Sequence, residues 1–308
     1  MKKPIVPTDI PFTSYVLSDT IKKLLARYPT IRQQIIGKSK SGAEIPALIF
    51  GTGKRAVCYN AAHHGNEWIT SPLLLRFLEQ YADAVSNPAS DEKIAGYDAK
   101  QLFANCTLHL IPMLNPDGVD VAIGSASDVA SDAAVQISKH FPAVPYPGGW
   151  KANANGVDLN LQYPAGWETA QKIKFSQGWN QPAPRDYVGP APLSEPESRA
   201  LYDYTTRHDF RLTLSYHSQG EVIYWRYLDH LPAGSREIGE LFAKLSGYEL
   251  EETPFVSGHA GYKDWFIKTY NRPGYTIEVG NGESPLPLAQ FDKIYKDNEG
   301  ILTTALIV

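Results

Sequence analysis

A histidine and a carboxylate stand three residues apart in the segment from Asn60 to Trp68. His64 and Glu67 follow an apolar run, and near the start of a helix this spacing lets both side chains reach one point. Imidazole nitrogen and carboxylate oxygen are normal zinc ligands, and a catalytic zinc needs three protein ligands and one open position. The pair alone is weak evidence, because the same spacing occurs by chance in many proteins.

Two further residues of the right chemical type stand at or within other apolar runs. His217 directly follows the run beginning at residue 212, and Glu278 lies inside the apolar run 275–279. A buried carboxylate is rare unless it is paired or functional. Two structural alternatives remain open at this point. His217 could be a core histidine bonded to a backbone carbonyl, and Glu278 could be an inward ion-pair partner of Arg272.

Alternating strand-like and helix-like segments would have to position these residues. Apolar runs predict strands at residues 31–36, 45–50, 57–59, 107–112, 212–216 and 275–279. Helical spacing predicts helices at 18–28, 68–84 and 235–245 and from residue 288 to the end. This alternation indicates an α/β fold whose sheet has parallel parts. Such sheets bind their ligands beyond the ends of strands, where His64 and His217 are expected.

The chain is predicted to form one domain over residues 1–308, with residues 1–30 as a lead-in segment and helix. Residues 143–192 are rich in Pro, Gly, Trp and Asn, and a loop region of this length is usually functional. Ser194 and Glu197 have the spacing of a capping box and predict the start of a helix. No internal repeat interrupts this organisation.

Composition excludes several classes of protein. The 308 residues are 43% hydrophobic and 20% charged, which is a globular balance, and the net charge of -4 gives no basic footprint for nucleic acid. No apolar stretch is long enough for a membrane span or an export signal, so we expect a cytoplasmic protein, with release to the cell wall or a sporulation compartment as the alternative. The two cysteines, Cys58 and Cys106, predict buried thiols rather than a disulfide scaffold.

Taken together and in order, the motifs resemble the zinc carboxypeptidase family. Within that family they are similar to the bacterial peptidases that cut γ-D-glutamyl–diaminopimelate bonds, and the resemblance covers about residues 36–287. The motifs that carry it are, in chain order, Ile36-Gly37-Lys38-Ser39, His64-Gly65-Asn66-Glu67-Trp68-Ile69, Asn115-Pro116-Asp117-Gly118, Gly156-Val157-Asp158-Leu159-Asn160, Ser194-Glu195-Pro196-Glu197, His217-Ser218, Gly261-Tyr262-Lys263-Asp264-Trp265 and Thr276-Ile277-Glu278.

The resemblance implies a zinc carboxypeptidase-like fold, with a mixed twisted β-sheet flanked by helices. It also implies that one Zn²⁺ per chain is held by His64, Glu67 and His217, and that Glu278 is the general base. The family stabilises the oxyanion with an arginine, and Lys151 is the nearest match to it in this chain. The alternative for Lys151 is an ordinary solvated side chain.

Departures from the family pattern narrow the expected substrate. Carboxypeptidases grip a free C-terminal carboxylate with an Asn-Arg pair, whereas here Asn160 is followed by Leu161. Asn66 and Val256 stand where the family often has Arg and its mobile tyrosine. An apolar side chain cannot form a bidentate carboxylate clamp. We therefore expect hydrolysis of the γ-D-glutamyl–meso-diaminopimelate (or L-Lys) amide bond of cell-wall muropeptides.

That substrate carries several carboxylates, so cations and hydrogen-bond donors are expected around it. Candidate substrate-binding residues are Asn160, Lys263, Arg185, Gln219, Tyr262 and His259. The expected partner is a peptide from peptidoglycan, with no nucleic acid and no membrane, and the sequence assigns no oligomeric state. The alternative functions are a broader carboxypeptidase, a deacylase of small acyl-amino acids, and an inert module that binds cell-wall peptides without cutting them.

Overall fold

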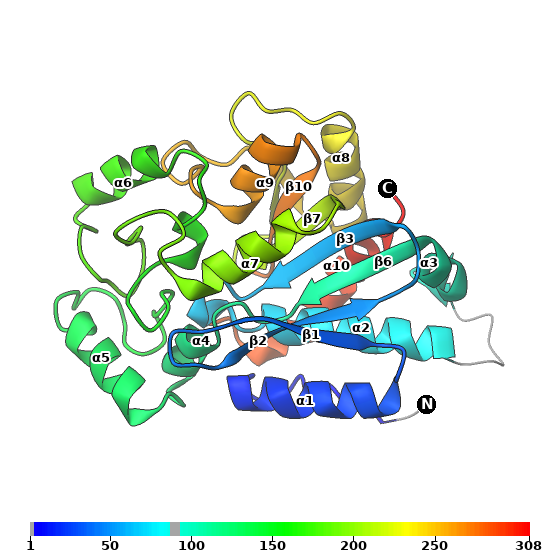
Figure 1. Cartoon of the computed structure of the whole chain (residues 1–308), viewed down its shortest axis with the longest axis horizontal. Helices are drawn as coiled ribbons and strands as arrows, with labels where there is room; N and C mark the ends of the chain where they lie inside the picture. Colours follow the sequence, from blue (N-terminus) through cyan, green and yellow to red (C-terminus); the bar gives the residue numbers. More distant parts are fainter. Residues whose placement is uncertain (1–2, 87–92) are drawn as a thin grey trace.

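The computed structural model describes residues 3–86 and 93–308 (Figure 1). Its helices are α1 (Ser14–Arg27), α2 (Thr70–Ser86), α3 (Ala99–Asn105), α4 (Pro116–Ile123), α5 (Asp128–Ser138), α6 (Trp167–Ser176), α7 (Pro196–Thr206), α8 (Ser235–Ser246), α9 (Tyr262–Tyr270) and α10 (Phe291–Thr304). Single 3₁₀ turns lie at Gly65–Glu67, Leu159–Leu161 and Leu288–Gln290.

The strands form one mixed eight-stranded sheet and one separate hairpin. They are β1 (Arg32–Lys38), β2 (Glu44–Phe50), β3 (Arg55–Ala61), β4 (Lys93–Ile94), β5 (Tyr97–Asp98), β6 (Cys106–Ile111), β7 (Phe210–His217), β8 (Val222–Tyr224), β9 (Glu249–Glu251) and β10 (Gly274–Glu278). The large sheet has the order β1-β2-β6-β3-β7-β10-β8-β9, and β4 pairs with β5. Its centre, from β6 through β3 and β7 to β10, is parallel, which confirms the mixed sheet that the resemblance implies.

Helices cover both faces of this sheet, so the central strands are buried on both sides. Figure 1 shows α1, α2 and α10 on one face and α7 and α9 on the other. The larger apolar core packs the first group against the sheet, with α2 residues such as Leu74 and Phe77 fully buried. A second core holds Tyr204 of α7 and Trp265 of α9. Strands buried on both faces need nearly continuous apolar runs, which explains why sequence patterning predicts β3 and β7.

The carboxyl ends of three adjacent parallel strands meet at one edge of the sheet. In the register of the sheet, Ala61 at the end of β3 lies beside Tyr216 of β7, and Glu278 of β10 lies beside His217. After β3 the chain continues to β6, which pairs with one edge of β3, whereas β7 pairs with the other edge of β3. Such a switch point leaves a crevice outside the strand ends. Topology therefore brings together residues that are more than 200 positions apart.

Two local predictions differ from the structure. The segment 143–192 is not irregular throughout, because it contains α6 and the 3₁₀ turn at Leu159–Leu161. The predicted capping box is wrong, because the N-cap of α7 is Glu195. The single hydroxyl proton of Ser194 is instead shared between side-chain oxygens of Gln162 and Glu195. The Glu197 carboxylate accepts from the backbone amide of Lys40, far from its own helix start.

Both cysteines, Cys58 and Cys106, are buried and unpaired, as predicted. Over the parts of the chain that the structure describes, none of the helices is both long enough and apolar enough to cross a lipid bilayer. The cytoplasmic location and the boundaries of a single domain over residues 1–308 stay predictions.

A buried histidine in β6 should make stability depend on pH. His109 Nδ1 lies 2.7 Å from the Tyr204 hydroxyl oxygen, and burial, aided by the positive charges of His208 and Arg32, lowers the pKa of His109 to about 4. The unfolded chain binds a proton at this residue below a pKa of about 6.5, but the folded chain does so only near pH 4. Stability is therefore lost as the pH falls between these two values.

We expect this residue to contribute about 2 kcal/mol to the loss of unfolding free energy between pH 8 and pH 5. Denaturant unfolding at the two pH values should show a smaller loss for His109→Gln than for the wild type, because glutamine does not titrate. The exposed His140, changed to Gln, is the matched control. Equal losses in wild type and His109→Gln would contradict the prediction.

Candidate active site

The first two metal-binding candidates lie in the tight connection that follows β3. His64 directly precedes the 3₁₀ turn that contains Glu67, so the two side chains emerge on one side of the chain. Gly65 lets this connection lie against its neighbours, because a Cβ there would stand 2.2 Å from the carbonyl oxygen of Gly118. Its amide also donates to the carbonyl oxygen of Lys151 at 2.9 Å. The glycine therefore fixes both candidates beside the segment that carries Lys151.

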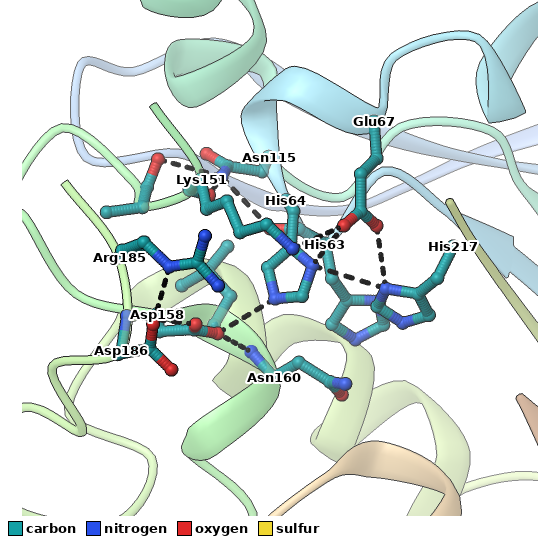
Figure 2. Close-up of polar contacts among 12 residues, drawn as sticks. His63, His64, Glu67, Asn115, Lys151, Asp158, Asn160, Arg185, Asp186 and His217 are labelled. Carbon is teal, nitrogen blue, oxygen red and sulfur yellow. Dashed lines mark hydrogen bonds and ion pairs between the residues drawn. The ribbon is translucent and has the colours of Figure 1, made fainter. Parts of the chain in front are cut away.

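The side chains of His64, Glu67 and His217 converge on one point (Figure 2). His64 Nδ1 lies 3.0 Å from Glu67 Oε1, and His217 Nδ1 lies 2.9 Å from Glu67 Oε2. The two Nδ1 atoms are 3.3 Å apart. All three residues are buried, and within the described parts of the chain they form the single group of at least three such side chains that could hold a metal ion.

This arrangement fits a zinc ion. Two ligands bonded to one tetrahedral zinc at about 2.0–2.1 Å stand roughly 3.3 Å apart, which is the separation between the two Nδ1 atoms. The donor set of two imidazoles and one carboxylate is typical of catalytic zinc sites, which keep a fourth position for water or substrate. The core-histidine alternative for His217 fails on the same contacts, because its Nδ1 faces Glu67 and not a backbone carbonyl.

Asp158 orients the first of these ligands from the opposite side of its ring. His64 Nε2 lies 3.0 Å from Asp158 Oδ1, and a carboxylate only accepts hydrogen bonds, so Nε2 carries the proton and Nδ1 faces the metal position. Burial alone would raise the pKa of Asp158, but the charge and hydrogen bond of His64 and the charge of Lys151 hold it below its usual range. Asp158 also accepts from the backbone amide of Asp186.

The Asp158→Asn variant should bind zinc about 10- to 100-fold more weakly than the wild type. Replacing the carboxylate by an amide removes the negative charge that makes the His64 imidazole a better ligand. Competition with a chromogenic chelator measures the affinity, and Asp209→Asn, at an exposed position, is the matched control. An affinity unchanged from wild type would show that Asp158 does not support the metal site.

Lys151 is positioned by a metal-binding candidate and is not an ordinary solvated side chain. Its ammonium lies 2.8 Å from Glu67 Oε1, and the side chain is only 19% exposed. Burial raises the pKa of Glu67, but the charges of His64 and Lys151 lower it by more. The pKa of Glu67 therefore lies well below its usual range. Glu67 is therefore ionised, as a metal ligand must be.

Glu278 ends β10 beside His217 and faces the same cavity. The ion-pair alternative is wrong, because Arg272 instead pairs with Asp209 at 2.6 Å. Burial raises the pKa of Glu278 to about 7, with a further rise from Glu67 and an opposing effect from His217. A carboxyl group with a pKa near neutrality suits both the acceptance and the return of a proton.

Two cavities adjoin this centre. The first, of about 230 Å³, contains the three metal-binding candidates and Glu278. The second, of about 430 Å³, lies along residues 143–145, 218–219 and 283–284. Both are lined by Lys151, Arg185, Tyr224 and Glu278, so the catalytic candidates stand where the two cavities join.

Four of the predicted substrate-binding residues line one or both cavities, and the other two do not. Asn160, Lys263 and Arg185 line the first cavity, and Arg185 and the exposed Gln219 line the second. Asn160 also accepts from the backbone amide of Tyr262 and so holds the start of α9. Lys263 is only 4% exposed, and its ammonium already contacts the Asp264 carboxylate, the Arg226 carbonyl and the Thr253 hydroxyl.

Tyr262 and His259 do not line either cavity. Tyr262 is fully buried in the core between the sheet and α7, and its hydroxyl lies 2.9 Å from that of Thr205. His259 is buried between the rings of Phe255 and Tyr227. For these two residues the substrate-binding prediction is therefore corrected to packing. An aromatic or imidazole ring next to a motif residue can lie in the core or in the cavity wall. Sequence spacing alone does not distinguish these two positions.

Sequence reasoning missed several residues that shape the site. Tyr224 of β8 borders both cavities close to Glu278, whose charge helps burial to raise the pKa of the phenol. Lys174 and Asp186 form an ion pair in the wall of the first cavity. The short strand β8 carries too few residues for a periodic signal. The pairing of Lys174 with Asp186 depends on how the long segment folds.

Comparisons with known proteins agree with this geometry. A family model described as "Zinc carboxypeptidase" matches residues 17–300. The chain is 39% identical over 296 residues to Gamma-D-glutamyl-L-diamino acid endopeptidase 1 of Lysinibacillus sphaericus, a match that covers 94% of this chain and 71% of that protein.

Solved structures share the fold. The crystal structure of thrombin activatable fibrinolysis inhibitor matches with a TM-score of 0.72 at 18% identity, covering 99% of this chain and 76% of that one. That of murein-tripeptide amidase MpaA from Escherichia coli O157 matches with a TM-score of 0.51 at 20% identity, covering 88% and 91%. The family match, the identity to the endopeptidase and the convergent ligand set lead to one conclusion: the chain belongs to the zinc carboxypeptidase family and is a zinc-dependent metallopeptidase.

Proposed function

We propose that this metallopeptidase hydrolyses the amide bond between the γ-carboxyl group of D-glutamate and meso-diaminopimelate, or L-lysine, in cell-wall muropeptides. The observation that carries the proposal is the set of cations around the first cavity. Beside the ligand set, its walls carry Lys151, Lys174, Arg185 and Lys263, each of which also contacts a carboxylate of the same wall. A muropeptide offers carboxylates on both sides of the scissile bond. The relative at 39% identity is named for an activity on γ-D-glutamyl-L-diamino acid bonds.

Leu161 supports an activity other than general C-terminal trimming. It lies in the wall of the first cavity directly after Asn160, where the carboxypeptidases that the chain resembles have an arginine. An apolar side chain offers no donors for a terminal carboxylate. A broad carboxypeptidase is the second candidate function, and it would need another grip for that group.

The roles proposed for the residues follow from their positions. When bound by His64, Glu67 and His217, zinc supplies Lewis acidity that polarises a carbonyl group and makes water easier to deprotonate near neutral pH. Glu278 takes the proton from the attacking water and returns it to the leaving amine. The Lys151 ammonium stabilises the negative charge that develops on the carbonyl oxygen. Lysine does this as a point charge, which suffices for a single oxygen.

The leaving diamino acid would occupy the first cavity, where Asn160 and Lys263 form part of the wall. The D-glutamyl residue and the peptide before it would extend into the second cavity, past Gln219. Room on both sides of Glu278 fits a substrate that continues in both directions.

A pair of tripeptides that differ in one linkage tests the proposal. L-Ala-γ-D-Glu-meso-diaminopimelate should be cut with a kcat/KM at least about 100-fold above that for the α-linked isomer, because the two isomers hold the free glutamyl carboxylate at different distances from the scissile bond, whereas the cations of the site have fixed positions. Preference for the α-linked isomer, or release of C-terminal residues from ordinary peptides with the γ-linked tripeptide left intact, would favour the broad carboxypeptidase.

A further inference from the structure

Arg185 holds a particular place in the site, because it borders both cavities. Of the charged residues at their junction, Glu278 is the proposed base and Lys151 is paired with Glu67. Lys174 and Lys263 line the first cavity only. Among the described residues that line the second cavity, the cations are therefore Lys151 and Arg185.

One edge of the Arg185 guanidinium is fixed and the rest is available. Its Nε donates to Asp186 Oδ2 at 2.6 Å. Asp186 is itself held, since Lys174 donates to its Oδ1 at 2.5 Å and its backbone amide donates to Asp158. The two terminal nitrogens of Arg185 make no hydrogen bond with any residue that the structure describes, and the side chain is 41% exposed.

The guanidinium points toward the catalytic centre. Figure 2 shows Arg185 extending from the position of Asp186 toward the group formed by Lys151, His64 and Asp158. Its positive charge acts to lower the pKa of Lys151, and the negative charge of Asp158 acts to raise the pKa of Arg185. Arg185 is therefore close to both residues. Two parallel N–H donors on a held guanidinium match the two oxygens of a carboxylate.

A γ-linked D-glutamyl residue places a carboxylate where an α-linked peptide has none. From the scissile carbonyl carbon, two methylene groups lead to the α-carbon, which carries a free carboxylate about 5 Å away along an extended chain. That carboxylate lies on the side opposite the leaving amine, which is the side of the second cavity in the proposed function. Lys151 is committed to Glu67 and the oxyanion, so Arg185 is the cation left for it.

We propose that Arg185 binds the free α-carboxylate of the D-glutamyl residue, so that the enzyme selects this acid over a substrate whose α-carboxylate is a neutral carboxamide. The inference rests on the proposed function and deepens it. The preference is charge-based, because a carboxamide has one acceptor oxygen and no negative charge for the guanidinium. Amidation of the substrate at this position would therefore protect it from cleavage.

The test compares two tripeptides, L-Ala-γ-D-Glu-meso-diaminopimelate and the same peptide with the α-carboxylate converted to a primary amide. Wild type should prefer the acid by roughly 10- to 100-fold in kcat/KM, which is the range for a charged hydrogen-bonded contact. Arg185→Met should lose about this factor on the acid and change little on the amide, so that the preference collapses. Arg236→Met, at an exposed position on α8, is the matched control and should keep the wild-type preference.

A merely structural role for Arg185 gives a different result. Loss of one of the two cations that pair with Asp186 would distort the site for both substrates, and Arg185→Met would then lower both kcat/KM values by the same factor. That outcome, or equal wild-type rates on acid and amide, overturns the inference and leaves the proposed function standing. Failure of wild type to cut either tripeptide overturns both.

Discussion

The Glu278→Gln variant is expected to lose about 10²- to 10⁴-fold in kcat on the γ-linked tripeptide while it keeps the zinc content of the wild type. Glutamine has the size of glutamate but cannot accept the proton of the attacking water. Glu278 is not among the three converging ligand candidates, so its replacement should leave the metal in place. Burial raises the pKa of Glu278 to about 7, which fits a group that both takes and returns a proton.

Steady-state kinetics and metal analysis by atomic emission on the same preparation check this prediction. Glu249→Gln, at an exposed position in β9, is the matched control and should have wild-type kcat. Loss of both zinc and activity in Glu278→Gln would instead make the residue a ligand. Retained activity would show that another group is the base.

The second large effect is expected for His217→Ala. Removing one of three protein ligands should lower the bound zinc to less than about a tenth per chain at equal free zinc, and the activity should fall by about 10³-fold or more because the site loses its Lewis acid. His217 Nδ1 lies 3.3 Å from His64 Nδ1 and 2.9 Å from Glu67 Oε2, and no other His, Cys, Asp or Glu of the described residues forms a group of three with these two.

Zinc titration followed by activity measurements tests this, with His140→Ala at an exposed position as the control. Circular dichroism and thermal melts establish that the variant is folded. A folded His217→Ala that binds zinc as tightly as the wild type would remove His217 from the ligand set.

The metal centre could be predicted from the sequence because its residues follow apolar strands. His217 ends β7 and Glu278 ends β10, and both strands are buried and read as apolar runs. His64 and Glu67 follow β3 in the same way. Parallel neighbours end at one edge of a sheet, which made these residues candidates, and the resemblance to the zinc carboxypeptidase family implied that they form one site. The position of each strand in the sheet could not be predicted from the sequence and is known only from the structure.

The walls of the cavities could be predicted only in part. Tyr262 lies next to Lys263 in the sequence, but Tyr262 enters the core and Lys263 the cavity wall, because successive residues at the start of a helix face different directions. Arg185 is oriented by Asp186, whose backbone adopts φ 64, a conformation that sequence patterns do not indicate. Ser194 and Glu197 match a capping box, yet their side chains form hydrogen bonds with Gln162 and Lys40, which are distant in the sequence.

Hydrolysis of the γ-D-glutamyl amide bond at the zinc centre is tested most directly by mass spectrometry of a digest made in ¹⁸O-water. Zinc-loaded protein and L-Ala-γ-D-Glu-meso-diaminopimelate should give free diaminopimelate and L-Ala-D-Glu with one ¹⁸O atom in the γ-carboxyl group. An intact tripeptide, or label in the carboxyl group of alanine, would contradict cleavage at this bond.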